Sequence, residues 1–449
     1  MFPINIGIDF GTSFSKICVR GPKSVGVAVC SFGDNLPSDA LIPSKFWVEE
    51  GGRIILPWNN GSEPQGAMVE YPKMALADLS DLKITGGTPP ICMQIKRSIE
   101  PLCALFVAHL LRMAKGWVDR HWRDYMRDGD VEWSANVGVP VAHLNSDAEH
   151  VFSKVLAVAW EWMNADLLPD KLVDLEMLYE YTSGIVDPED SWCQPFPEIA
   201  AAVQAFVSSR EARPSVYVFF DVGGGTLDGV AFNFRRDDGV PIVDFYSGAV
   251  EPLGVQAITE KICLLLAPES PSPELVASTL VGETRKNFSC RDEFAGEIRK
   301  LVGKTVMGAK KKDGRNWRQD LIQASDIPRP YYYPIKDKDI RPLVVFMGGG
   351  GCHSEFYCDA VASTYQEFKH GNAGVPPYAL TVVPKPDDMD LGAISEEDFH
   401  RFLIAYGLSI PYGEGAEVNL PREFDDVDRN ASIKKKSDFD YENSKDIFD

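Results

Sequence analysis

The chain has 449 residues, of which 45% are apolar and 25% charged, and these values are typical of folded globular proteins. This composition excludes a disordered chain, and the absence of any run of about 18 apolar residues argues against a membrane-spanning protein. The net charge of −21, from 45 basic and 66 acidic residues, argues against nucleic acid or an anionic membrane as the main partner.

The nine cysteines include no Cys-x-x-Cys pair, and an odd number leaves one thiol unpaired in an oxidising compartment. Residues 1–9 show no basic leader followed by a long apolar segment. We therefore expect reduced thiols and a cytoplasmic location. The seven histidines have no spacing typical of metal ligands.

The first predicted element is a β-hairpin that has a second copy later in the chain. Residues 4–19 contain an apolar strand, the turn Asp9-Phe-Gly-Thr-Ser and a second strand, and residues 216–232 repeat this plan around Asp221-Val-Gly-Gly-Gly-Thr-Leu-Asp. The two leading aspartates are 212 residues apart, which predicts two lobes of similar plan with a ligand cleft between them. Two unrelated glycine hairpins remain the alternative.

The other elements follow in chain order. Gly, Pro and charge in residues 51–90 indicate a small subdomain, and later apolar patterns predict several helices and buried strands. The expected elements are a helix over 101–126, a strand over 137–140, a helix over 147–163, helices over 250–266 and 291–312, a strand over 341–347 and a helix over 396–408. From about residue 421 short acidic and basic runs predict a mobile polar tail.

The two hairpin turns are typical of phosphate binding. Glycine lets backbone N–H groups approach an anion closely, and threonine and serine add hydroxyl groups. Carboxylates beside a polyphosphate become favourable when a magnesium ion lies between them, held through water. The candidate metal ligands are Asp9 and Asp221, with Asp228 as a third carboxylate. The candidate phosphate-binding residues are Gly11, Thr12, Ser13, Phe14, Gly223, Gly224, Gly225 and Thr226.

Three motifs together resemble those of a known superfamily. They are Ile-Gly-Ile-Asp9-Phe-Gly-Thr-Ser, Phe-Phe-Asp221-Val-Gly-Gly-Gly-Thr-Leu-Asp228 and Val-Val-Phe-Met-Gly348-Gly349-Gly350-Gly351. In order and spacing, from residue 4 to about residue 412, they resemble the phosphate-1, phosphate-2 and adenosine motifs of the actin-like ATPases. The form Gly-Gly-Gly-Thr-x-Asp is most similar to the nucleotide-binding domain of DnaK-type 70-kDa heat-shock chaperones.

The resemblance implies an α/β protein with the actin-like ATPase fold, in which two lobes, each built on a ribonuclease H-like mixed sheet with flanking helices, enclose a nucleotide cleft. Lobe I would be 1–205 with an insertion over about 36–99, and lobe II would be 206–394 with a subdomain over about 251–334. A closing helix over 395–415 would return to lobe I, and 416–449 would be a polar tail. Because so few apolar residues follow the closing helix, we expect no peptide-binding domain.

The resemblance also implies catalytic roles. Glu180, in Leu178-Tyr-Glu-Tyr-Thr-Ser-Gly184, would orient the attacking water, although Tyr181 stands where the family has proline. Lys73 would contact the γ-phosphate; the alternative is a solvated surface lysine. Asp228 and Thr226 complete the expected catalytic set. The segment Leu403–Leu408 resembles the closing helix, in which a small residue permits tight packing between the lobes.

The adenosine motif departs from the family. Gly348, Gly349 and Gly350 are in place, but the family's following serine and adenine-stacking arginine are absent, and His353 is the candidate replacement. The helix on the other side of the adenine would be residues 294–311, with Glu297, Arg299 and Lys300 as candidates.

The expected function is therefore hydrolysis of ATP with magnesium in a nucleotide-dependent switch that acts on an unidentified protein partner or client. The cofactors implied are ATP or ADP and Mg²⁺. Three alternatives stay open: a filament-forming ATPase that associates with itself, a non-hydrolysing nucleotide sensor, and a small-molecule kinase of the same fold.

Overall fold

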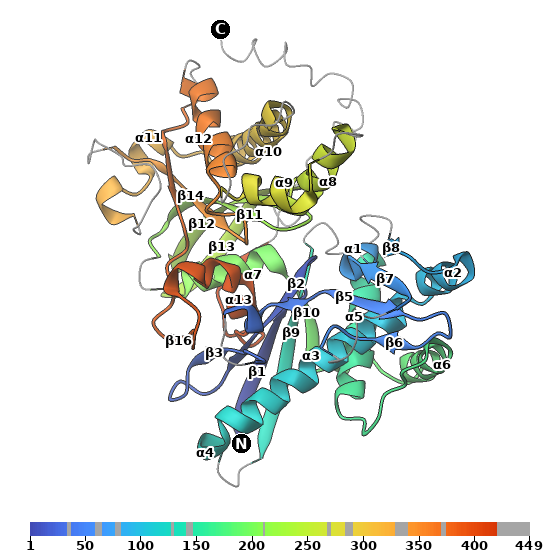
Figure 1. The fold of residues 1–449 in the computed structure, drawn as a ribbon. Helices are drawn as coiled ribbons and strands as arrows, with labels where there is room; N and C mark the ends of the chain where they lie inside the picture. Colours follow the sequence, from blue (N-terminus) through green and yellow to red (C-terminus); the bar gives the residue numbers. More distant parts are fainter. Residues whose placement is uncertain are drawn as a thin grey trace. The chain divides into compact units, whose positions relative to one another are not determined.

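The computed structural model (Figure 1) divides into two compact units, each described here by itself. Unit 1 comprises Met1–Phe206 and Lys385–Gly415, and unit 2 comprises Val207–Pro384 and Ala416–Asp449. The structure describes residues 1–33, 37–58, 65–76, 82–126, 130–140, 147–209, 212–266, 271–282, 291–327, 340–369 and 374–419. Of the predicted polar tail over 416–449, residues 417–419 form a strand that pairs in the sheet of unit 2, and the rest from residue 420 onward lies outside the described residues. Parts of the predicted subdomains over 36–99 and 251–334 also lie outside them.

Unit 1 is built on a seven-stranded sheet. Its strands are β1 (Phe2–Asp9), β2 (Phe14–Arg20), β3 (Val27–Val29), β4 (Ile42–Pro43), β9 (Val131–Val139), β10 (Cys193–Pro197) and β16 (Met389–Asp390). The order is β10-β9-β1-β2-β3-β16, with β4 on β2. The hairpin β1–β2 is antiparallel, while β9 and β10 run parallel to β1. Apolar residues of β1 are buried on both faces of the sheet, as expected for a central strand covered by helices on both sides.

Unit 2 is built on a six-stranded sheet of the same plan. Its strands are β11 (Ser215–Val222), β12 (Leu227–Asp237), β13 (Val240–Glu251), β14 (Leu343–Gly348), β15 (Tyr378–Thr381) and β17 (Glu417–Asn419). The order is β15-β14-β11-β12-β13-β17, and every pair has the same direction as its counterpart in unit 1. The similarity seen between the two hairpins in the sequence therefore extends across both sheets.

Unit 1 contains helices of several lengths. They are α1 (Pro72–Leu76), α2 (Pro89–Arg97), α3 (Ile99–His121), α4 (Arg123–Met126), α5 (Asp147–Met163), α6 (Leu172–Ser183), α7 (Glu198–Val207) and α13 (Leu403–Leu408), with 3₁₀ turns η1 (Pro37–Ala40), η3 (Pro188–Asp190) and η5 (Glu396–Arg401). Helix α3 is long and apolar enough to cross a membrane, but most of it is buried and it packs against α5. Its apolar surface is therefore used in the core.

The insertion predicted in unit 1 contains a sheet of its own. Its four strands, in the order β6-β5-β7-β8, are β6 (Ile54–Ile55), β5 (Lys45–Val48), β7 (Ala67–Glu70) and β8 (Lys83–Thr85). The sequence pattern over 51–90 indicated a subdomain without predicting its strands. In β5 and β7 buried and half-buried residues alternate, which is the pattern of strands with one face on a core.

Unit 2 carries its own helices. They are α8 (Val255–Leu265), α9 (Pro273–Leu280), α10 (Arg291–Lys312), α11 (Trp317–Asp320) and α12 (Glu355–Lys369), with the 3₁₀ turn η4 (Ala324–Asp326). Helix α10 packs on α12, β12 and β13. The helix predicted over 250–266 begins later, at Val255, because residues 250 and 251 complete β13. The chain is therefore a mixed α/β protein, as the sequence predicts.

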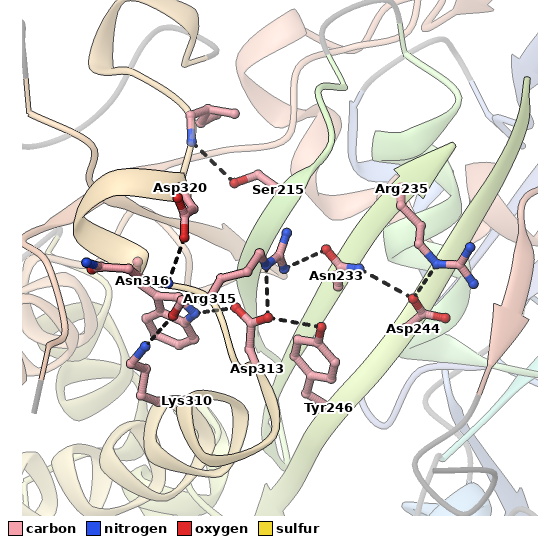
Figure 2. Close-up of polar contacts among 12 residues, drawn as sticks. Ser215, Asn233, Arg235, Asp244, Tyr246, Lys310, Asp313, Arg315, Asn316 and Asp320 are labelled. Atoms are coloured by element: carbon pink, nitrogen blue, oxygen red, sulfur yellow. Dashed lines mark hydrogen bonds and ion pairs between the residues drawn. The ribbon is translucent and has the colours of Figure 1, made fainter. Parts of the chain in front are cut away.

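A polar network fastens the loop after α10 to β12 and β13 (Figure 2). The buried carboxylate of Asp313 accepts hydrogen bonds from the Trp317 indole, from Arg315 Nε at 2.9 Å and from the Tyr246 hydroxyl at 3.4 Å. Arg315 also donates to the side chain of Asn233, 2.8 Å away. Because these donors lose much of their water in the folded chain, they depend on Asp313 as their acceptor.

Substitution of Asp313 by alanine is expected to lower the free energy of unfolding by about 2 kcal/mol, since it leaves buried donors without their acceptor. Urea denaturation followed by tryptophan fluorescence measures the change. Asp326→Ala provides the matched control, because this aspartate is exposed in η4. Equal stability of the two variants would show that the network contributes nothing measurable.

Helix α13 closes unit 1 against strands from its N-terminal part. The side-chain amides of Asn5 and Asn136 donate to the carbonyl oxygen of Leu408 at 3.2 and 2.9 Å, so the last turn of the helix is capped by β1 and β9. Gly407 lies against the backbone of Ala201 in α7, and any side chain at 407 would clash with it. The small residue of the closing helix therefore permits a close contact with α7 inside unit 1, and not between the two lobes as the resemblance implied.

Candidate functional site

In unit 1 the predicted phosphate-1 turn connects β1 and β2. Asp9 is the last residue of β1, is 3% exposed, and forms an ion pair with Lys16 of β2 (Nζ–Oδ2 2.7 Å). Gly11, Thr12 and Ser13 form the turn, and Phe14 begins β2 with an exposed side chain. A β-carbon at Gly11 would clash with the carbonyl oxygen of Phe14 and approach Lys16 Nζ to 3.3 Å, so this tight turn requires glycine.

A second ion pair lies beside Asp9. Lys73, on α1, is 3% exposed and pairs with Glu198, the first residue of α7. Burial raises the pKa of Glu198 above its ordinary value, the Lys73 ammonium opposes this rise, and the charge of Asp9 adds to it. Asp9, Lys16, Lys73 and Glu198 thus form one group, the unit 1 charge cluster, of two carboxylates and two ammonium groups. Lys73 is buried, so the surface-lysine alternative is wrong.

Glu198 lies in the unit 1 charge cluster, whereas Glu180, the glutamate that the resemblance implied as the water-orienting residue, does not. Glu180 is exposed near the end of α6, and among the described contacts it makes none with the unit 1 charge cluster. Glu198, in contrast, directly follows β10, and Gly138 on the neighbouring strand leaves room for its side chain, because a β-carbon there would lie 2.8 Å from Glu198 Cγ. The sequence signal was a glutamate directly after a strand and before the alanine-rich start of α7.

In unit 2 the predicted phosphate-2 and adenosine motifs lie on neighbouring strands. Asp221, near the end of β11, pairs across the sheet with Asp228 on β12 and with Gly348 at the end of β14. Asp221, Asp228 and Thr226 are all partly accessible. Gly349 has a φ of +77°, and a β-carbon there would lie 2.6 Å from the Asp221 carboxylate. The two motifs therefore meet at Asp221.

The turn formed by Gly223, Gly224, Gly225 and Thr226 is held against the start of α8. Val255 N–H donates to the carbonyl of Gly223 at 3.0 Å, and Gln256 N–H donates to that of Gly224 at 2.8 Å. These bonds orient the turn's carbonyl groups toward the helix and so fix its backbone. In the adenosine motif Gly350 and His353 are exposed.

A cavity of about 370 Å³ opens next to this turn. Its wall includes Glu251, Pro252 and Leu253, directly before Gly254, which donates its N–H to Gly225. Another part of its wall is a face of α10. The charged lining residues are Glu251, Lys261, Glu297, Lys300 and Lys304. Of the predicted adenine-contacting residues, Glu297 and Lys300 line this cavity, whereas Arg299 lies near Glu367 at 4.0 Å.

Oxygen donors suited to a magnesium ion stand in both units. In unit 2 Asp221 and Asp228 are paired residues on the neighbouring strands β11 and β12, and oxygen is the ligand type that magnesium prefers. In unit 1 the Asp9 carboxylate contacts Lys16 through Oδ2. Both predicted metal ligands, Asp9 and Asp221, therefore carry a suitable donor group.

Comparison with known proteins adds no relative to this description. A scan of the chain against protein-family models found no match, and a search of the curated proteins also found none.

Proposed function

We propose that the chain is a nucleotide-binding ATPase with the actin-like fold, closest in its motifs to the DnaK-type chaperone domains. One observation carries the proposal: two sheets of identical strand order each place an acidic, glycine-containing turn between their first two strands. Such turns supply backbone N–H groups to phosphate.

Unit 2 is proposed to hold most of the nucleotide. The turn formed by residues 223–226 binds phosphate, Asp221 and Asp228 hold a hydrated magnesium ion, and the adjoining cavity takes the base. When bound, the ion supplies positive charge that offsets the charge on the phosphates. The cavity is large enough for a nucleobase, and its lysines and glutamates offer both donors and acceptors.

Unit 1 is proposed to supply the hydrolytic groups. Lys73 and Lys16 stabilise negative charge that develops on the γ-phosphate, and Glu198 orients the attacking water through its carboxylate. Such catalysis depends mainly on position and charge. The pKa of Glu198, raised by burial, suits a group that accepts a hydrogen bond from water.

The output is proposed to be a change in the binding of a protein partner when ATP is replaced by ADP, because loss of the γ-phosphate removes contacts that favour one state.

The free thiols of the described cysteines agree with a proposed cytoplasmic location, where ATP and magnesium are present. ATP-dependent light scattering distinguishes this switch from a filament, and product analysis distinguishes it from a kinase.

A non-hydrolysing nucleotide sensor is the second candidate, because Lys16 occupies the Asp9 carboxylate. Single-turnover assays with radiolabelled ATP separate the two candidates. An ATPase releases phosphate in the presence of magnesium, while a sensor binds nucleotide with the same affinity and leaves it intact.

Calorimetric titration with Mg-ATP and Mg-GTP tests the proposed function. The wild-type chain is expected to bind one nucleotide, and Asp221→Ala is expected to weaken binding about tenfold or more, which corresponds to about 1.4 kcal/mol. Asp237→Ala is the matched control, because this aspartate lies at the far, exposed end of the same hairpin. Absence of binding to any magnesium nucleotide, or equal affinity in both variants, would contradict the proposal.

A further inference from the structure

Exposed apolar side chains concentrate in one short part of unit 1. Of the fourteen large apolar side chains that are exposed among the described residues, six lie between residues 167 and 192. These six are Leu167, Val173, Met177, Tyr181, Ile185 and Trp192. Because single exposed apolar residues are common but a concentration of them is not, this segment needs an explanation.

Helix α6 forms the centre of this segment and is apolar on two opposite faces. One face is buried against α5 and α3 through Leu172, Leu175 and Tyr179. The other face carries Val173, Met177 and Tyr181 at i, i+4 and i+8, with 55%, 59% and 68% of their surfaces exposed. Helices that are apolar all round are normally buried on all sides. The second face, which we call the α6 stripe, is covered by nothing in the described part of the chain.

The α6 segment is an addition to the plan that the two units share. In unit 2 the chain passes from β14 through α12 to β15, and the described residues of this passage form no other helix. The equivalent passage in unit 1, from β9 through α5 to β10, includes α6 and η3 as extra elements. Figure 1 shows α6 on the outside of unit 1, away from the central sheet. The second unit shows that the sheet forms without such a helix.

The surroundings of the α6 stripe are strongly acidic. Residues 164–192 contain eight carboxylates and one lysine. Asp174 and Glu180 flank the stripe on its two sides by helical position, and both are exposed. An apolar stripe between rows of negative charge is complementary to a helix that has apolar residues on one face and lysine or arginine beside them.

We propose that the α6 stripe is a docking site for a basic amphipathic helix of a partner protein. The apolar face of that helix covers Val173, Met177 and Tyr181, and its basic residues meet the flanking carboxylates. A second copy of this chain fits less well, since its net charge is −21 and its own α6 segment is acidic. The proposal is independent of the proposed nucleotide site.

The test uses the full-length chain and a fluorescein-labelled model peptide of about 18 residues, with leucines on one helical face and lysines on the other. Fluorescence anisotropy measures its affinity. Met177→Asn removes an apolar contact without changing the charge and is expected to weaken binding about tenfold. Met93→Asn is the matched control, because Met93 is 56% exposed on α2, outside the stripe, and this variant is expected to bind like wild type.

Asp174→Lys tests the contribution of charge. It is expected to weaken binding about threefold, and the weakening is expected to be larger at low salt.

Each other outcome overturns the proposal. If Met177→Asn and the wild-type chain bind the peptide with equal affinity, the peptide binds outside the α6 stripe. If the wild-type chain binds a peptide of the same composition but with scrambled leucines equally well, charge alone attracts the peptide. If the wild-type chain dimerises in sedimentation experiments and Met177→Asn abolishes the dimer, the stripe binds a second copy of the chain. If the wild-type chain binds zwitterionic lipid vesicles and this substitution abolishes that binding, the stripe is a membrane-binding surface. Thermal melting of each variant verifies that the chain remains folded.

Discussion

Lys73→Met is expected to slow the single-turnover hydrolysis of ATP by about 10²-fold or more, since it removes a charged group proposed to stabilise the transition state. The substitution also leaves Glu198 as a buried carboxylate without its partner. Removal of one partner of a buried ion pair costs about 3–5 kcal/mol of folding free energy. Rapid-quench kinetics measure the rate, and urea denaturation measures the stability.

The stability of Lys73→Met is expected to depend on pH. Burial already raises the pKa of Glu198 from its ordinary value of 4.5, and loss of the opposing ammonium group raises it further. The folded chain then holds a proton that the unfolded chain releases, so the free energy of unfolding falls as pH rises from about 4.5 through the raised pKa. The loss is at most about 1.4 kcal/mol per pH unit.

The double variant Lys73→Met with Glu198→Gln provides the control, because the amide does not titrate. Its stability is expected to change less between pH 5 and pH 7.5 than that of Lys73→Met. Identical pH dependence of the single and double variants would show that another group titrates. Lys83→Met is the control for the general effect of removing a lysine. Lys83 pairs with Glu70 in a partly exposed salt bridge outside the unit 1 charge cluster.

Gly407→Val is expected to lower the free energy of unfolding by about 3 kcal/mol or more. The added side chain meets the backbone carbonyl of Ala201, and a backbone group cannot move aside as a flexible side chain can. The helices α13 and α7 must separate, which disturbs the carbonyls of α13 capped by Asn5 and Asn136. Differential scanning calorimetry measures the loss.

Gly413→Ala serves as the comparison for this effect. Gly413 lies in the same C-terminal part of unit 1 with no atom close to where a β-carbon would stand, although its φ of +83° makes any side chain slightly strained. A modest loss of about 1 kcal/mol is expected there. If Gly407→Val were no less stable than Gly413→Ala, the close contact between α13 and α7 would not exist in solution.

The sequence predicts elements whose signal is local. The helices over 147–163 and 291–312 have those bounds in the structure, because their apolar spacing is regular from end to end. The helix expected over 396–408 is instead the 3₁₀ turn η5 followed by α13. A 3₁₀ turn and an α-helix share nearly the same pattern over six residues, so periodicity does not separate them.

The candidate site was predictable in part. The glycine turns stand in recognisable motifs, and Lys73 lies at about the distance after Asp9 that the resemblance implies. No motif of the resemblance marks Lys16 or Glu198. Lys16 joins the unit 1 charge cluster through hairpin register, which pairs it with Asp9, and Glu198 joins it through the parallel pairing of β10 with β9. The Asp9–Lys16 pairing lies within a hairpin that the sequence predicts, so only its exact register was missing. The pairing of β10 with β9 joins distant segments, depends on tertiary packing and cannot be inferred from local composition.

The assembly of unit 1 from two separate stretches of chain has a consequence for its biosynthesis. Helix α13 contacts β1, β2 and β9, yet it leaves the ribosome only after residues 207–384 of unit 2. The usual order, in which the N-terminal part of a nascent chain matures first, is therefore reversed at the last step. A released chain that ends near residue 384 would contain β11 to β15 of unit 2, while β1, β2 and β9 of unit 1 would still lack their final helix.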